Sequence, residues 1–365
     1  MKILLIGEYS NVHATLAEGL RALGHDVCVI SNGDFWKDYP RDIDVARTPG
    51  KIGGIRLMLR LCTLLPKMRG YDVVQLINPM FFELKVERLF WFYKWLRRNN
   101  RRLILGAYGM DYYWVHECVT NKHLRYSDFN IGDELRTDLD AMKERHDWLG
   151  TPKEHLNRMI ADDCDGIITG LYEYDVCYRP HFPSKTCFIP YPIIPANPTI
   201  PTSPTLPIKI FVGISRARSA YKGTDVMLRA AQDLATRYPD RVALTVAEGI
   251  AFSKYQTMLA NSDVLLDQLY SYTPAMNALL AMSKGIVVVG GGEPENYDIL
   301  GETELRPIVN VQPNYDSVYH ELEQLVLHPE HLPQLKQQSV DYIHRHHDYL
   351  KVAQAYEAFY TKKLC

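Results

Sequence analysis

The chain has 365 residues, of which 47% are apolar and 23% are charged, and this length is enough for two domains with separate cores. Its formal net charge of -2 gives no general attraction to nucleic acid or to an anionic membrane, so either contact would need a local basic patch. The 7 cysteines include no CxxC pair, so neither a disulfide framework nor a zinc site is predicted. We expect no metal, no nucleic-acid partner and a reducing cytoplasm.

The start of the chain and its apolar runs bear on targeting. The sequence enters a predicted strand at once, MKILLIG, where a secretory signal would have a charged region, an apolar stretch and a cleavage site. Nowhere do 18 uninterrupted apolar residues occur. The expectation is a protein with neither a signal peptide nor a membrane-spanning helix.

Short apolar runs alternate with helical patterns through the first 190 residues. A first βαβ unit is predicted from a strand over Lys2–Ile6, a helix over His13–Leu23 and a strand over Val27–Ser31. Further strands are predicted at Val73–Leu76, Leu103–Leu105, Gly166–Thr169 and Thr186–Ile189. Such alternation is typical of an α/β fold whose parallel sheet is covered by helices on both faces.

A proline-rich segment, 191–207, interrupts this pattern and can form neither a helix nor a central strand. A recognition peptide is one interpretation, but an interdomain linker is favoured because the alternation resumes at once beyond it. The expected elements there are a strand over Ile208–Gly213, a helix over Thr224–Arg237 and a strand over Val242–Val246. We therefore predict doubly wound domains over 1–190 and 208–348 that face a cleft, and a terminal helix, 349–365, that crosses the junction or caps the second domain.

The stretch 261–302 combines a strand over Val264–Leu266, a loop, a helix opening near Pro274 and a strand over Ile286–Val289. A glycine turn with two glutamates, Glu293 and Glu295, follows. This is a βαβ unit, and ligands of such sheets collect at the carboxyl ends of the strands.

The loop after the first strand, GEYSNVH from Gly7 to His13, is one candidate ligand site. Its backbone amides and the following helix N-terminus are suited to a phosphate or a sugar. The loop lacks the GxGxxG spacing, and no GxxxxGK[ST] occurs, so a nicotinamide cofactor and a P-loop gain little support. Alternatively, it borders the cleft without touching a ligand.

The segment GISRARSAYKG, 213–223, is a second candidate because Arg216, Arg218 and Lys222 precede a helix and follow a strand. These cations and the helix amides would suit one diphosphate. A basic surface loop is the alternative, but a location at the carboxyl end of a strand favours the ligand site.

These residues carry a resemblance to a known family. The 213–223 loop, the run SDVLLDQ and the run LLAMSKGIVVVGGG resemble the second domain of GT-B glycosyltransferases, in particular the retaining, family 4-like group related to sucrose and glycogen synthases. With the first-strand loop and HDVCVIS, the resemblance covers most of the chain. It implies two Rossmann-like domains and a terminal helix that crosses back to the first.

The resemblance also implies a function. A sugar would pass from a nucleotide-diphosphate donor, held mainly by the second domain, to an acceptor held mainly by the first. No metal would be needed, because cations at positions like Arg216 and Lys222 neutralise the diphosphate. A glycan or lipid-linked glycan acceptor, as in polysaccharide biosynthesis, is expected.

Two family features differ in this sequence. Relatives usually carry two glutamates eight residues apart, and Tyr272 and Leu280 stand at those positions here. The donor ribose is then expected to contact other groups: Asn277, Glu293, Glu295 and the backbone amides of Thr273 to Met276. In the first domain, Tyr108 stands where the family often has a histidine, whereas Asp111 keeps the position of the frequent polar partner.

The predicted site residues follow from these comparisons. The predicted catalytic residues are Arg216, Lys222 and Asp111. The predicted donor-binding residues are Gly7, Arg218, Tyr272, Thr273, Asn277, Glu293 and Glu295. The predicted acceptor-side residues are Ser10, Asn11, His13, Tyr108, Tyr112 and His116. The neighbouring aromatics, Tyr113 and Trp114 included, would either stack on a sugar or belong to the core.

The substitutions admit two functional interpretations. Retaining transfer in this fold is thought to proceed on one face of the sugar, with the leaving phosphate taking the acceptor proton, so electrostatic stabilisation of that phosphate would be the main contribution. The other interpretation is a catalytically silent protein that binds a nucleotide sugar or a partner protein. Sugar epimerisation has no supporting carboxylate pattern.

Two further patches have competing interpretations. Residues 90–102, rich in aromatic and basic side chains, form either a peripheral contact with the inner membrane face or a solvated helix face that packs on the sheet. The apolar and basic helix expected over Ile55–Met68 adds to the membrane interpretation. The run HRHH, 344–347, is interpreted as a surface helix end and not as a metal site.

Overall fold

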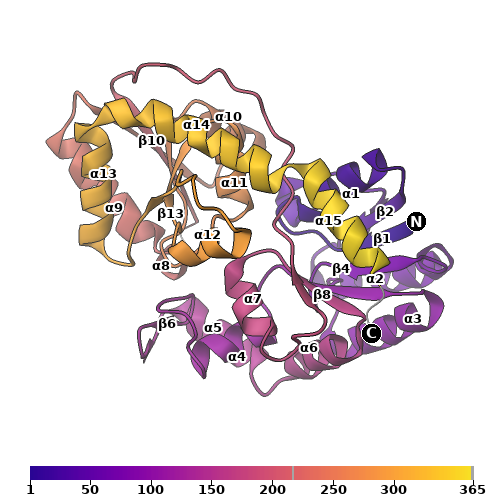
Figure 1. The fold of residues 1–365 in the computed structure, drawn as a ribbon. Helices are drawn as coiled ribbons and strands as arrows, with labels where there is room; N and C mark the ends of the chain where they lie inside the picture. The colour runs from indigo at the N-terminus through magenta and orange to yellow at the C-terminus, as the bar shows by residue number, and fades with distance from the viewer. Residues whose placement is uncertain (216–217, 363–365) are drawn as a thin grey trace. The chain divides into compact units, whose positions relative to one another are not determined.

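The computed structural model describes residues 1–215 and 218–362. The chain forms two compact units (Figure 1). The first comprises Met1–Glu117, Glu144–Pro192 and the segment beginning at Tyr349, and the second comprises Cys118–Lys143 and Ile193–Asp348. The predicted domain boundaries stay a prediction, but residues 118–143, which they assign to the first domain, pack within the second unit.

The first unit is built on a seven-stranded parallel sheet with the order β3-β2-β1-β4-β5-β8-β9. Its strands are β1 (Lys2–Ile6), β2 (Asp26–Ser31), β3 (Ile43–Asp44), β4 (Val73–Leu76), β5 (Leu103–Ala107), β8 (Gly166–Thr169) and β9 (Thr186–Phe188). The strand order reverses between β1 and β4, so the loop after β1 lies at the switch point where such sheets bind ligands.

Helices connect these strands, as the alternating pattern predicts. They are α1 (Val12–Ala22), α2 (Gly50–Leu64), α3 (Val86–Asn99), α6 (Pro152–Asp163) and α7 (Tyr172–Tyr178), with short turns η1 (Phe35–Lys37) and η2 (Leu65–Met68). Helices α4 (Tyr112–Val119) and α5 (Leu139–Trp148) lead into and out of residues 118–143. The local signals are clear at α6, where the Thr151 side chain accepts from the Lys153 amide and Pro152 begins the helix.

The C-terminal helix α15 (Tyr349–Thr361) belongs to the first unit and packs on α1. The packing requires Gly19, because a Cβ there would lie 2.6 Å from the Tyr349 carbonyl oxygen and 2.7 Å from the Ala353 Cβ. The prediction that the terminal helix returns to the first domain is thereby confirmed.

The second unit has a five-stranded parallel sheet with the order β11-β10-β12-β13-β14. Its strands are β10 (Ile208–Ile214), β11 (Val242–Glu248), β12 (Val264–Leu266), β13 (Val287–Gly290) and β14 (Val309–Asn310). The switch point lies between β10 and β12. Residues 118–143 add a small antiparallel hairpin of β6 (Asn130–Ile131) and β7 (Glu134–Leu135). Two Rossmann-like parallel sheets confirm the predicted α/β fold class.

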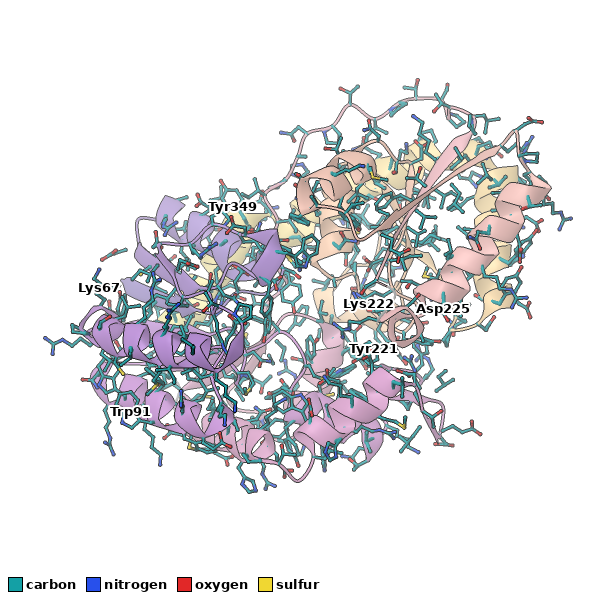
Figure 2. The ribbon with its side chains drawn as sticks, turned by 180° about the vertical axis from the view of Figure 1, so that it is seen from behind. Lys67, Trp91, Tyr221, Lys222, Asp225 and Tyr349 are labelled. Atoms are coloured by element: carbon teal, nitrogen blue, oxygen red, sulfur yellow. The ribbon has the colours of Figure 1, made fainter. Side chains whose placement is uncertain are left out.

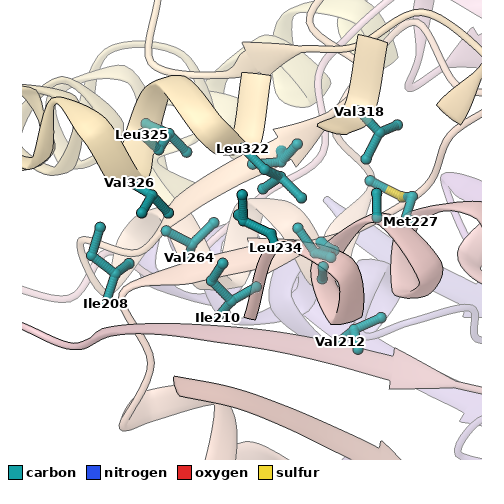
Figure 3. Packing of buried hydrophobic residues seen from close by; sticks show 14 of the residues in the cluster. Ile208, Ile210, Val212, Met227, Leu234, Val264, Val318, Leu322, Leu325 and Val326 are labelled. Carbon is teal, nitrogen blue, oxygen red and sulfur yellow. The ribbon is translucent and has the colours of Figure 1, made fainter. Parts of the chain in front are cut away.

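Helices α9 (Thr224–Arg237) and α13 (Tyr315–Leu327) cover one face of this sheet, and Figure 3 shows their side chains interlocked with those of β10 and β12. Val212, Met227 and Leu322 are among the fully buried contributors. The other helices are α8 (Ser219–Lys222), α10 (Phe252–Ala260), α11 (Met276–Ser283), α12 (Pro294–Leu300), α14 (Leu332–Tyr342) and the turns η4 (Pro329–His331) and η5 (Ile343–His347).

The run HRHH is not a surface helix end. It forms the π-helical turn η5, in which His347 is buried, His346 Nε2 lies 2.6 Å from Glu302 Oε2 and Arg345 also bonds Glu302. Among residues 1–215 and 218–362, no group of three or more His, Cys, Asp or Glu side chains could hold a metal. No helix in this described part of the chain is both long and apolar enough to span a membrane.

Candidate functional site

The β10/β12 switch point brings together the loops that follow these two strands. Helix α8 ends at Lys222, and Gly223, with φ of +71°, begins the turn into α9 (Figure 2). The Leu269 amide donates to the Lys222 carbonyl at 3.0 Å. A Cβ on Gly223 would lie 2.5 Å from the Leu269 Cβ, so only glycine allows this approach. The two loops are therefore locked together at the ligand-binding edge of the sheet.

Asp267, directly after β12, is a half-buried acid at this edge. Burial raises its pKa, while the charge of Lys222 and hydrogen bonds from Asn277 and Gln268 oppose the rise. Asn277 Nδ2 donates to Asp267 Oδ1 at 3.3 Å, and the Tyr255 hydroxyl donates to Asn277 Oδ1 at 3.1 Å. Of the predicted residues, Asn277 therefore bonds Asp267 and Lys222 acts on it through its charge. The sequence reasoning missed Asp267, although its place after a buried strand could have indicated it.

The basic loop itself is only partly described. Arg216 lies outside the described residues. Arg218 is exposed, its amide donates to the Ser215 carbonyl at 2.9 Å, and its guanidinium lies 5.0 Å from the centroid of the Tyr221 ring. Arg218 and Lys222 therefore stand at the two ends of α8.

Side chains of residues 118–143 form hydrogen bonds and ion pairs with Glu293 and Glu295. Glu293 Oε1 accepts from the Tyr126 hydroxyl at 2.6 Å and from Gln312 Nε2 at 2.8 Å, and Glu293 Oε2 accepts from Arg125 Nη2 at 2.7 Å. Arg125 Nη1 lies 2.5 Å from Glu295 Oε1. Burial would raise the pKa of Glu293, but these donors together hold it below its ordinary value. Three protein donors already satisfy the Glu293 carboxylate, and neither Arg125 nor Tyr126 was predicted from the sequence.

Tyr272, which stands at a family glutamate position, is almost fully buried. Its hydroxyl accepts from the Arg125 amide at 2.6 Å, and its ring centroid lies 4.7 Å from that of Tyr126. Thr273 is also buried, and its carbonyl accepts from Ser271 Oγ at 2.7 Å. These contacts join the loop after β12 to residues 118–143.

In the first unit, Glu8 occupies the amides that were expected to approach a phosphate. Its carboxylate accepts from the His13 amide at 3.2 Å and from the Ala14 amide at 2.8 Å. Burial raises the pKa of Glu8 to about 8. Gly7 has φ of +86°, and a Cβ there would lie 2.2 Å from Ile77 Cγ2. The glycine therefore serves close packing, and the start of α1 is capped from within the chain.

Ser10 and Asn11 both adopt left-handed backbone conformations, with φ of 53° and 75°. Such conformations cost roughly 1–3 kcal/mol each in residues other than glycine and are often kept at binding loops. The Ser10 amide donates to Asp34 Oδ2 at 2.9 Å, and Lys37 Nζ donates to Ser10 Oγ at 3.2 Å. The buried Asn11 Oδ1 has no hydrogen-bond partner among the described residues. This loop keeps the strained geometry expected of a ligand contact.

His13 and Tyr108 belong to a polar network inside the core. His13 Nδ1 lies 2.8 Å from the Gly7 carbonyl oxygen and His13 Nε2 lies 3.0 Å from Gln75 Nε2. Burial lowers the pKa of His13 to about 3, so the ring is neutral and Nε2 accepts from Gln75. Gln75 Nε2 also donates to the Tyr108 hydroxyl at 3.4 Å, and this hydroxyl lies 2.5 Å from that of Tyr356 on α15. Of these predicted acceptor-side residues, His13 therefore bonds groups of the core, and Tyr108 also bonds the C-terminal helix.

Asp111 is fully buried at the start of α4. Its Oδ1 accepts from the Trp114 amide at 2.9 Å and its Oδ2 accepts from the Tyr178 hydroxyl at 2.8 Å. Burial raises its pKa to about 7. In this structure Asp111 caps a helix and joins it to α7.

Of the two acceptor-side residues on α4, Tyr112 is buried and His116 is half-buried. His116 Nδ1 lies 3.0 Å from Glu117 Oε1, and the same oxygen lies 2.7 Å from His181 Nε2. Tyr113 and Trp114 are buried as well, which favours the core interpretation of this aromatic run.

Comparison with known proteins identifies the fold to which this architecture corresponds. No protein-family model matches the sequence, and no curated protein matches it. Among solved structures, sucrose-phosphate synthase from Thermosynechococcus elongatus superimposes with a TM-score of 0.60 at 13% identity, over 99% of this chain and 98% of that one. HepE from Anabaena, in complex with UDP and glucose, has a TM-score of 0.59 at 12% identity over 98% of both chains. The fold is GT-B.

A third GT-B neighbour, a UDP-N-acetylglucosamine 2-epimerase from Listeria monocytogenes described as putative, has a TM-score of 0.56 at 10% identity, over 98% of this chain and 95% of that one. The GT-B neighbours thus include both glycosyltransferases and an epimerase. The resemblance stated from the sequence is confirmed at the level of the GT-B fold, with similar structures over nearly the whole chain.

Within this GT-B chain, the predicted residues fall into three groups. In the first group, Asn277 bonds Asp267, Lys222 acts on it through its charge, and Arg218 lies at the N-terminal end of α8. In the second group, Tyr272, Glu293 and Glu295 contact residues 118–143, and Thr273 follows Tyr272 in the same loop. The remaining described ones lie in the first unit, where Ser10 and Asn11 form a strained loop and the others pack into the core or its edge: Gly7, His13, Tyr108, Asp111, Tyr112 and His116.

Proposed function

We propose that this chain is a glycosyltransferase that moves a sugar from a nucleotide-diphosphate donor to an acceptor hydroxyl. The observation that carries the proposal is the meeting of two loops at the switch point of the second sheet, where the Leu269 amide donates to the Lys222 carbonyl and Asn277 donates to the half-buried Asp267. Parallel sheets bind their ligands there, and the loop that leads to Lys222 carries Arg216 and Arg218 as well. Cations at such an edge suit a diphosphate.

The proposed reaction retains the anomeric configuration. The acceptor oxygen bonds to the anomeric carbon while the bond from that carbon to the diphosphate oxygen breaks. The acceptor proton passes to the departing phosphate. Lys222 and Arg216 stabilise the negative charge that develops on this phosphate, which is the main catalytic contribution and is supplied without a metal. Asn277 is the proposed contact to the ribose.

The proposed acceptor is a glycan or a lipid-linked glycan, and the proposed location is the cytoplasm with a peripheral membrane contact. The apolar side of α3 is buried in the core, which leaves Trp91 as the exposed aromatic of residues 90–102. Helix α2 supports the contact better, because Ile52, Ile55 and Leu59 are 66%, 54% and 62% exposed.

The second candidate is a catalytically silent GT-B protein that binds a nucleotide sugar or a partner protein. One observation favours it: the Glu293 carboxylate, a proposed substitute for the missing ribose-binding glutamate, already accepts from Arg125, Tyr126 and Gln312. In that case, donor binding would persist without transfer.

A donor panel separates the candidates. The purified chain is incubated with UDP-, GDP- and ADP-sugars, with and without glycan acceptors, and nucleotide release is followed. The glycosyltransferase proposal expects acceptor-dependent release of one nucleotide. Clear donor binding without release would support the silent protein, and interconversion of the donor sugar without release would indicate an epimerase.

A further inference from the structure

Residues 118–143, here called the strap segment, pack on the carboxyl edge of the second sheet although they arise from the first half of the chain. At one end, Arg125 and Tyr126 contact the loop after β12 and the turn after β13. At the other end, Arg136 contacts α8, next to the hairpin of β6 and β7 (Figure 1). The strap segment therefore touches the same loops that carry the proposed donor site.

Arg136 contacts both α8 and the loop after β12 through one guanidinium. Its guanidinium is buried and lies 3.8 Å from the centroid of the Tyr270 ring and 5.8 Å from that of the Tyr221 ring. Arg136 Nη2 donates to the Ala220 carbonyl at 2.8 Å and lies 3.1 Å from Asp138 Oδ2. A single planar cation thus joins three parts of the second unit.

These contacts bear directly on Lys222. Ala220 and Tyr221 precede it within the four-residue helix α8, and Tyr270 follows Asp267 in the loop after β12. A helix this short has little stability of its own, so its position depends on outside contacts. Arg136 donates to α8, which carries Lys222, and stacks on Tyr270 in the loop that carries Asp267.

We propose that Arg136 is a positioning residue for the donor site. It keeps α8 against the loop after β12, so that Lys222 stays beside Asp267 where the diphosphate is proposed to bind. The role in diphosphate binding rests on the proposed function, whereas the role of Arg136 in holding α8 does not. The proposal assigns a role in donor binding to a segment that the sequence pattern places in the other half of the chain.

Lysine is the informative replacement, because it keeps the charge of Arg136 but lacks the planar fork that donates to Ala220 while stacking on Tyr270. Arg125 supplies the matched control. It lies in the same strap segment and is 54% exposed, and its side chain binds Glu293 and Glu295 near the turn after β13. Arg125 bonds Tyr272, Glu293 and Glu295, which all lie outside α8, so Arg125→Lys alters the strap segment without releasing that helix.

The first measurement is UDP affinity by calorimetry for the full chain and both variants. Arg136→Lys is expected to weaken UDP binding about tenfold, which corresponds to about 1.4 kcal/mol, whereas Arg125→Lys changes it less than about threefold. Equal affinity of Arg136→Lys and the unchanged chain would overturn the inference.

The second measurement needs no ligand and follows amide hydrogen exchange at Leu269, which donates to the Lys222 carbonyl. Arg136→Lys is expected to speed this exchange while Arg125→Lys leaves it unchanged. Unchanged exchange in Arg136→Lys would overturn the positioning role. If the unchanged chain binds no UDP, GDP or ADP, the proposed donor site fails, and the exchange result alone decides whether Arg136 holds α8.

Discussion

Lys222 is the residue on which the proposed donor site most depends, because its charge acts on the half-buried Asp267 carboxylate at the switch point. A lysine that is already held near Asp267 does not have to move out of the solvent before it contacts a diphosphate. The buried acid Glu8 has the opposite effect. Its carboxylate accepts from the His13 and Ala14 amides of α1, so neither amide is available to a ligand.

Lys222→Ala is expected to weaken nucleotide binding by about 1.5–3 kcal/mol, the loss typical of a hydrogen bond to a charged group. Calorimetry with UDP measures it. Lys254→Ala, which removes an exposed lysine from α10 of the same unit, is the control for net charge. An unchanged affinity in Lys222→Ala would show that the donor loop is misassigned.

Glu8 makes stability depend on pH. Its pKa is about 8 in the folded chain against an ordinary value of 4.5, so the folded state keeps a proton that the unfolded state loses in this range. The free energy of unfolding therefore falls as the pH rises from about 5 to about 8. Glu8→Gln lacks this titration. As the pH rises, the Tm of the unchanged chain should therefore fall relative to the Tm of Glu8→Gln. Parallel Tm curves would contradict the assignment.

At the scale of elements, α15 shows how a helix far away in sequence becomes part of the first unit. Its apolar side packs on α1, and two of its three tyrosines, Tyr356 and Tyr360, bond Tyr108 and Gln75 of the sheet. The family position that often holds a histidine is thus tied to the C-terminal helix in this chain.

Tyr356→Phe tests this attachment. The change removes the bond between the Tyr356 and Tyr108 hydroxyls inside the core and is expected to lower the free energy of unfolding by about 1–3 kcal/mol. Urea unfolding measures the loss. Tyr349→Phe on the same helix is the control, since Tyr349 (labelled in Figure 2) is half-buried and lies outside the bonds that join Tyr356 to Tyr108 and Tyr360 to Gln75. Equal losses in both variants would argue against the network.

At the scale of the whole molecule, the two units differ in what they offer to a partner. The second unit carries the proposed donor edge. The first unit carries α2, in which exposed Ile52, Ile55 and Leu59 alternate with basic residues and no acid occurs. Such a helix face complements an anionic bilayer, because apolar side chains enter the interface while cations meet the headgroups.

The chain is accordingly expected to sediment with vesicles that contain phosphatidylglycerol but much less with phosphatidylcholine alone, and less at high salt. Replacing both Ile55 and Leu59 by serine should lower the bound fraction several-fold, since each buried side chain contributes about 1.5–3 kcal/mol. Ile194→Ser, in the linker, removes an apolar side chain of similar exposure, 53%, as the control. Equal binding of the double variant and the control would contradict a lipid contact through α2.

The local pattern was sufficient for most of the fold. The predicted bounds of β1, β4, β8, α9 and β12 agree with the structure at both ends, because buried parallel strands are short apolar runs and helices begin and end at local signals. The short elements α8, β6 and β7 were not predicted, since they are too brief for a periodic signal. Lys222 and Asn277 were identified because each lies in a segment that follows a predicted strand.

The sequence by itself thus determined the alternation of strands and helices, the resemblance to GT-B proteins and the basic loop, all of which depend on neighbouring residues. Tertiary structure alone decided that Glu293 bonds Arg125 and Tyr126, that His13 is a core histidine and that residues 118–143 belong to the second unit. Contacts between residues 62 or more positions apart, as all of these are, leave no periodic trace in one sequence. They form because buried polar groups must find partners wherever the fold brings them together.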